Sequence, residues 1–172
     1  MEQIILRRCD VSDVEVLRKL SEITFRETFG ADNTPADMEC YVKEHFSVSR
    51  MKEELGNFHS LFFLAVHDGK AVAYMKLNFS EAQTEPDYPN SLELQRIYVL
   101  HDFKHNNIGR LLMEKAIEVC RREQLGYLWL GVWEHNAAAI RFYEKQGFKM
   151  CRTHQFTLGT DVQTDYIMKC FV

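Results

Sequence analysis

The segment from Ser91 to Arg122 has the residue types of a phosphate-binding site. It begins with the apolar run LELQRIYV, continues through the polar stretch HDFKHNN, and enters a long amphipathic pattern at Ile108. The first turn of a helix offers unpartnered N–H groups and partial positive charge, and both stabilise a bound phosphate. Gly109 allows close approach of the backbone, and Asn107 tolerates a left-handed conformation. The segment therefore predicts a pyrophosphate cradle, although an Asn and a Gly before a helix also occur for capping alone.

A second segment, LWLGVWEHNAAAIRFYEKQGF, carries polar and aromatic side chains at a regular spacing. It starts as an apolar strand and continues as a short helix that Gly147 ends. Asn136, Ile140 and Tyr143 follow one another at helical spacing, which places Asn136 and Tyr143 on nearly one face. The Asn136 amide could contact a ligand, and the Tyr143 phenol could donate a proton. A helix cap at Asn136 and a packed ring at Tyr143 would explain the same residues.

Alternating helix and strand patterns surround these two segments. Apolar residues at helical spacing predict helices over 11–29, 34–46, 47–56, 108–123 and 136–146. Strand-like runs cover 4–8, 61–66, 71–79, 92–99, 127–132, 148–156 and 165–171, and Asp68-Gly69 predicts a hairpin turn. The strand, helix, strand order from 92 to 132 adds a parallel pair. We expect an α/β (α+β) fold with a central mixed, mostly antiparallel sheet of about seven strands flanked by helices.

Length and composition limit the classes of protein that fit. A chain of 172 residues is typical of a single domain, here 1–172. No apolar run reaches the roughly 18 to 20 residues of a membrane span, and the N-terminus lacks the apolar region of a signal peptide. Five widely spaced cysteines without a CxxC pair are typical of reduced thiols. We therefore expect a soluble, cytoplasmic protein that has no membrane partner.

The net charge of −4 is unevenly distributed along the chain. Acidic residues gather in the first half, whereas the proposed phosphate loop is flanked by Lys104, His105, Arg110, Arg121 and Arg122. This asymmetry fits an anionic ligand on one side and a cationic ligand on the other, and solvated charged faces are its ordinary explanation. Nucleic-acid binding would need a basic excess on one face, so no such partner is expected. No metal is expected either, because the spacing of His101 and His105 suits a metal only on a helix.

Taken together, the two segments resemble the GNAT superfamily of acetyl-CoA-dependent N-acetyltransferases. The loop from Lys104 to Gly109 falls on the Q/R-x-x-G-x-G/A pyrophosphate motif of that family, and the helix bearing Asn136 and Tyr143 falls on its second motif. Lys104 replaces the usual Gln or Arg, and Asn107 replaces the first glycine. A lysine still presents a cation, and Asn tolerates the required backbone, so we expect cofactor binding to persist.

The resemblance implies roles for individual residues. Tyr143 matches the tyrosine that protonates the departing thiolate, and Glu93 lies where some relatives carry the base that deprotonates the amine. An acidic residue at a strand start is also commonly just solvated or ion-paired. The backbone of the strand would hold the pantetheine arm, with Asn136 as a side-chain contact. The implied cofactor contacts are Ile97, Tyr98, Val99, Lys104, His105, Asn106, Asn107, Ile108, Gly109, Arg110, Asn136 and Tyr143.

The implied activity is direct transfer of an acetyl group from acetyl-CoA to a primary amine. In SLELQRIYV, in WLGVWEHNAAAIRFYEKQGF and in the tail QTDYIM, the chain looks most like the PaiA-type bacterial spermine/spermidine N-acetyltransferases, which implies a polyamine acceptor. Two alternatives stay open: acetylation of a protein N-terminus or lysine, and acetyl-CoA binding without turnover in a sensor module. A homodimer is expected only by analogy with the superfamily.

Overall fold

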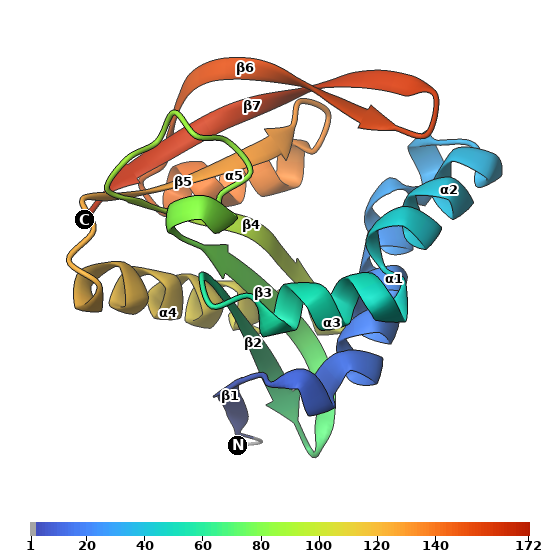
Figure 1. Ribbon diagram of the computed structural model, residues 1–172, viewed down its shortest axis with the longest axis horizontal. Coiled ribbons are helices and arrows are strands. Elements are labelled where there is room, and N and C mark those ends of the chain that lie inside the picture. The colour runs from blue at the N-terminus through green and yellow to red at the C-terminus, as the bar shows by residue number, and fades with distance from the viewer. Residues whose placement is uncertain (1–2) are drawn as a thin grey trace.

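The computed structural model describes residues 3–172, and Figure 1 shows how their helices and strands are arranged. The strands are β1 (Ile4–Arg8), β2 (Ser60–His67), β3 (Lys70–Asn78), β4 (Ser91–Val99), β5 (Tyr127–Trp133), β6 (Lys149–Leu158) and β7 (Asp161–Phe171). The helices are α1 (Val14–Phe29), α2 (Pro35–His45), α3 (Val48–Gly56), α4 (Ile108–Arg122) and α5 (Ala137–Lys145).

The strands form a seven-stranded sheet in the order β1-β2-β3-β4-β5-β7-β6. All neighbours are antiparallel except β4 and β5, which are parallel and are joined through α4. The mixed, mostly antiparallel sheet that the sequence predicts is therefore confirmed.

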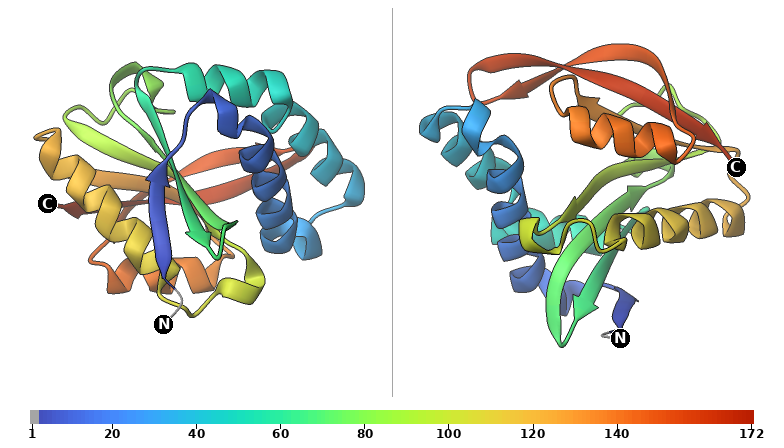
Figure 2. Two further views of the ribbon diagram at one scale, coloured as in Figure 1. Left: turned by 90° about the horizontal axis from the view of Figure 1, so that it is seen from below. Right: turned by 180° about the vertical axis from the view of Figure 1, so that it is seen from behind.

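Helices cover both faces of the sheet. On one face, Leu112 of α4 and Tyr143 of α5 pack into a large apolar core with Leu92 and Leu94 of β4. On the other face, a second core contains buried residues of α1, α2 and α3, including Leu17. Figure 2 shows α4 and α1 on opposite sides of the strands. Because side chains of a strand alternate between faces, Glu93 of β4 lies on the face opposite α4 and α5.

The two parallel strands at the middle of the sheet pair over only part of their length. Partners run from Ser91 and Tyr127 to Glu93 and Trp129, although β4 continues to Val99 and β5 to Trp133. Figure 1 shows the two strands running apart beyond this point. The second half of β4 therefore pairs with β3 on one side, and within residues 3–172 its backbone groups on the β5 side have no strand partner.

Local sequence signals set most element boundaries. The Thr34 side chain accepts a hydrogen bond from the Asp37 N–H and caps α2, and the Ser47 side chain accepts one from the Arg50 N–H and caps α3. The turn at Asp68-Gly69 has positive φ at both residues, as a tight hairpin requires. Strand β7 begins at Asp161, four residues before the predicted start at 165. A tertiary contact explains this difference, because the Thr160 N–H at the hairpin tip donates to Asp37 of α2.

Candidate active site

The loop before α4 has the backbone geometry of an anion cradle. Asn107 is left-handed, with φ 59° and ψ 12°, and His105 also has a positive φ of 69°. Asn107 occupies the N-cap position, yet its side chain makes no capping hydrogen bond. The N–H groups of the first turn of α4 are therefore left for an external acceptor. The side chains from Lys104 to Asn107 are exposed, which makes the loop accessible.

Gly109 has a packing role in addition to the predicted close approach to a ligand. Its φ is not in the left-handed range. A Cβ added to Gly109 would lie 3.4 Å from Cζ of the Phe142 ring on α5. The glycine therefore lets α5 lie directly against the first turn of α4, and it joins the two predicted motif segments in space.

The second half of β4 offers an open strand edge next to this loop. Ile97, Tyr98 and Val99 pair with Met75, Tyr74 and Ala73 of β3, and their side chains are half-buried. On the β5 side their N–H and C=O groups face the opening between the parallel strands. An extended chain with amide groups, such as a pantetheine arm, can bind such an edge like an added strand.

Tyr143 lies in α5 with only 8% of its surface exposed. Burial raises its pKa above the ordinary value, so the phenol stays protonated at neutral pH. Burial also raises the pKa of Tyr98, and Tyr143 adds a smaller contribution. Asn136 caps α5, since its Oδ1 accepts from the Ala139 N–H at 3.3 Å. Its amide nitrogen remains for other contacts.

Glu93 lies on the face of the sheet opposite α4 and α5, and only 2% of its surface is exposed. Its Oε2 accepts from Asn78 Nδ2 at 3.0 Å and from the Thr84 N–H at 2.8 Å. Its Oε1 accepts from the Thr84 hydroxyl at 2.5 Å. The carboxylate therefore holds the loop between β3 and β4, and a proton reaches it from solvent only through Thr84 or a water molecule.

Sequence reasoning missed a second carboxylate on this face. Asp165 of β7 lies opposite Trp133 of β5 and His154 of β6 in the sheet. Its Oδ2 lies 3.3 Å from the position of a Cβ added to Gly131. No local motif marks Asp165, because its environment is made by strands far apart in the chain. The tail QTDYIM contains it, but alternation there identifies only a strand.

A buried ion cluster supports β3 and β4 beneath the site. Arg96 donates to both oxygens of Glu54, at 2.8 and 3.1 Å, and Lys76 Nζ lies 3.0 Å from Glu54 Oε2. Despite burial, which opposes ionisation, the two cations lower the pKa of Glu54 to about 2. Burial and the Arg96 charge lower the pKa of Lys76 to about 8. The cluster ties α3 to the strands that carry the site.

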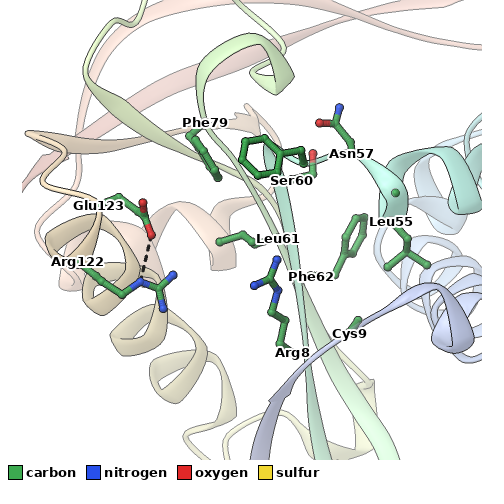
Figure 3. A pocket seen from close by; sticks show the side chains of 12 residues that line it. Arg8, Cys9, Leu55, Asn57, Ser60, Leu61, Phe62, Phe79, Arg122 and Glu123 are labelled. Atoms are coloured by element: carbon green, nitrogen blue, oxygen red, sulfur yellow. Dashed lines mark hydrogen bonds and ion pairs between the residues drawn. The ribbon is translucent and has the colours of Figure 1, made fainter.

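A separate cavity of about 470 Å³ lies between β1, the start of β2 and the last turn of α4. Figure 3 shows Arg8 and Arg122 on two sides of it, with Arg122 paired to Glu123 at 3.1 Å. It is at the opposite end of α4 from Asn107 and shares no residue with the site above.

No group of three or more His, Cys, Asp or Glu side chains among residues 3–172 has a metal-binding arrangement. No helix within the described range is long and apolar enough to cross a membrane.

Comparison with known proteins agrees with this geometry. The profile of the acetyltransferase (GNAT) family matches residues 19–148. An uncharacterized N-acetyltransferase of Lactobacillus delbrueckii subsp. lactis is 39% identical over 150 residues, or 87% of each chain. The spermidine N(1)-acetyltransferase of Thermoplasma acidophilum is 23% identical over 149 residues, covering 84% of this chain and 88% of that protein.

The fold has a solved counterpart. The crystal structure of the PaiA N-acetyltransferase from Thermoplasma acidophilum in complex with coenzyme A matches with a TM-score of 0.81, at 22% identity over 99% of both chains. The fold and these matches define an acyltransferase that uses acetyl-CoA. The chain belongs to the GNAT family of N-acetyltransferases.

Proposed function

We propose that this enzyme acetylates a primary amine of a small polycationic molecule, with spermidine or spermine as the candidate acceptors. The observation that carries the proposal is the division of the site between the two faces of the sheet. Tyr143 and the predicted cofactor loop lie on the face of α4 and α5. The carboxylates of Glu93 and Asp165 lie on the other face, where a cationic acceptor would approach.

The residues present fit acetyl-CoA. In this proposal the amides from His105 to Arg110 hold the pyrophosphate, with Lys104 as a nearby cation. The β4 edge from Ile97 to Val99 holds the pantetheine arm, and the Asn136 amide contacts the same arm. A backbone N–H of this edge polarises the thioester carbonyl. The coenzyme supplies an activated acetyl group, and the protein supplies orientation and proton transfer.

Proton transfer in the proposed reaction uses Thr84, Glu93 and Tyr143. The acceptor enters as an ammonium ion, whose proton passes to the Thr84 hydroxyl while that hydroxyl gives its own proton to Glu93. The neutral nitrogen forms a bond to the thioester carbon, the carbon–sulfur bond breaks, and Tyr143 protonates the leaving sulfur. The second proton of the nitrogen then returns to the Tyr143 oxygen, which restores the phenol.

A thiol-release assay with acetyl-CoA tests the proposal. The acceptor panel contains spermidine, spermine, short diamines, monoamines, aminoglycosides and peptides with a free N-terminus or lysine. We expect the highest kcat/KM with polyamines or diamines. Preference for a peptide would replace the proposal with protein acetylation, and tight acetyl-CoA binding without turnover of any amine would indicate a sensor module.

A further inference from the structure

Asp165 is a largely buried carboxylate without a hydrogen-bond donor of its own. Its side chain is 16% exposed, and Nε2 of His154 lies 3.8 Å from its Oδ2, beyond hydrogen-bond distance. Within residues 3–172 no hydrogen bond to this carboxylate is formed. A largely buried carboxylate that accepts no hydrogen bond is destabilising when it is charged, and such groups are characteristic of functional sites.

The charged neighbours of Asp165 are already paired with one another. Glu85, from the loop that Glu93 and Thr84 hold, lies 2.7 Å from Arg152 and 3.1 Å from Nδ1 of His154. Arg152 is therefore directed to Glu85 and not to Asp165. Burial, and to a lesser degree the Glu85 charge, raises the pKa of Asp165 to about 6 although His154 opposes this shift. A bound cation within hydrogen-bond distance would stabilise the carboxylate further.

The Asp165 carboxylate lies close against the backbone of Gly131, which has no side chain. Trp129 and Trp133 flank Gly131 on the same face of β5, and both are buried. Any larger residue would place its Cβ 3.3 Å from both Asp165 Oδ2 and His154 Cε1. Gly131 itself is exposed, so a ligand can reach the carboxylate at this point.

We propose that Asp165 binds a second ammonium group of the acceptor while the first ammonium group loses its proton at Thr84 and Glu93. This inference rests on the proposed function and adds the residue that selects a diamine or polyamine over a monoamine. Glu93 pairs with Trp129, and Gly131 lies two residues further along β5, which corresponds to about 7 Å. An offset of this size along the strand is within the span of a short alkyl diamine.

The chemistry of the site favours an organic ammonium group over a metal ion. One carboxylate offers a charge-assisted hydrogen bond, which suits an alkylammonium ion. A divalent cation would require several more oxygen ligands.

The test compares Asp165→Asn with wild type, using spermidine and 1,4-diaminobutane as diamine acceptors and butylamine as the monoamine. We expect Asp165→Asn to raise KM for the diamines at least about tenfold, since a hydrogen bond to a charged group is lost. The kcat for the diamines and the KM for butylamine should change less than about twofold. Asp161→Asn, an exposed carboxylate on the same strand, is the matched control.

A second variant and a calorimetric measurement test the role of Asp165 in diamine binding without relying on enzyme turnover. Gly131→Ala should weaken diamine binding without a change of charge, because the methyl group would crowd the carboxylate. Calorimetry of spermidine with the coenzyme A-bound protein should show binding to wild type and at least about tenfold weaker binding to Asp165→Asn. Equal affinity in the two proteins, or no spermidine binding to wild type, would overturn the role of Asp165. Failure of wild type to acetylate any amine would instead contradict the proposed function.

Discussion

Gly109 and Phe142 bring the two motif segments into contact. The aromatic ring lies 3.4 Å from where a Cβ of Gly109 would be, so the first turn of α4 and the middle of α5 meet at a position where only a small residue fits. Tyr143, the neighbour of Phe142, belongs to the apolar core that α4 and α5 share.

Substitutions at Gly109 should show a sharp dependence on size. Gly109→Ala places its methyl at ordinary contact distance and should change acetyl-CoA affinity less than about threefold. Gly109→Leu should displace Phe142 and weaken binding more than about tenfold, since overpacking typically costs 1–3 kcal/mol. Calorimetry measures both values. Unchanged affinity in Gly109→Leu would mean that this contact does not position the site.

Asn107 replaces the first glycine of the family motif, and its backbone conformation allows the effect of this replacement on acetyl-CoA binding to be tested. Its φ of 59° is a conformation that glycine adopts freely. Asn107→Gly should therefore tighten acetyl-CoA binding by about two- to fivefold, because αL strain is relieved and the backbone can approach the phosphate. Asn106→Gly, at a neighbouring position without positive φ, is the control. A clear loss of affinity in Asn107→Gly would show that the loop does not hold pyrophosphate.

Tyr143→Phe should remove the proposed acid while keeping the packing of the ring. We expect kcat to fall by about 10²- to 10⁴-fold with little change in acetyl-CoA affinity. Because burial raises the pKa of Tyr143, the wild-type phenol is protonated at neutral pH and its ionisation should not limit the rate there. Steady-state kinetics and cofactor titration provide the comparison. Normal turnover in the variant would exclude Tyr143 as the acid.

Glu93→Gln tests the proposed base. We expect kcat to fall by about 10²-fold or more, with partial recovery at high pH, where more of the amine is already neutral. Thr84→Val keeps the carboxylate and removes the hydroxyl that donates to Glu93 Oε1, so it should also lower kcat if protons pass through Thr84. A pH–rate profile identical to wild type in both variants would remove these residues from the proton path.

The Glu54 cluster makes a prediction about stability and pH. Glu54→Gln leaves Lys76 and Arg96 buried without their shared anion and should lower the free energy of unfolding by about 3 to 5 kcal/mol. Arg50 is the control, because its half-exposed side chain places Nε 3.2 Å from Glu54 Oε1. Arg50→Gln should change the free energy of unfolding by less than about 1 kcal/mol. Urea denaturation measures both variants.

The sign of the pH dependence follows from the depressed pKa of Glu54. That pKa is lowered from 4.5 to about 2, so the stabilisation is present above pH 4.5 and is lost as the pH falls toward 2. Denaturation at several pH values in this window should show that the free energy of unfolding falls less steeply with falling pH in Glu54→Gln than in wild type. An equal decline would mean that Glu54 does not titrate with the cluster.

Much of the fold was predictable because its determinants are local. Caps at Thr34 and Ser47, the Asp68-Gly69 turn, and apolar periodicity all act within a few residues of the boundary they set. The start of β7 was not predictable in this way. The contact between Thr160 and Asp37 that extends the hairpin joins residues far apart in the chain.

The sequence by itself determined the family, the element order and the two motif segments, because each depends on residue types at short spacing. It also placed Glu93 on a strand and Tyr143 on a helix, where the structure has them. Only the tertiary structure decided how accessible these groups are, because burial and hydrogen bonding depend on distant segments. Glu93 is covered by the loop at Thr84. Asp165, which no motif marks, lies beside Gly131 because three strands bring it there.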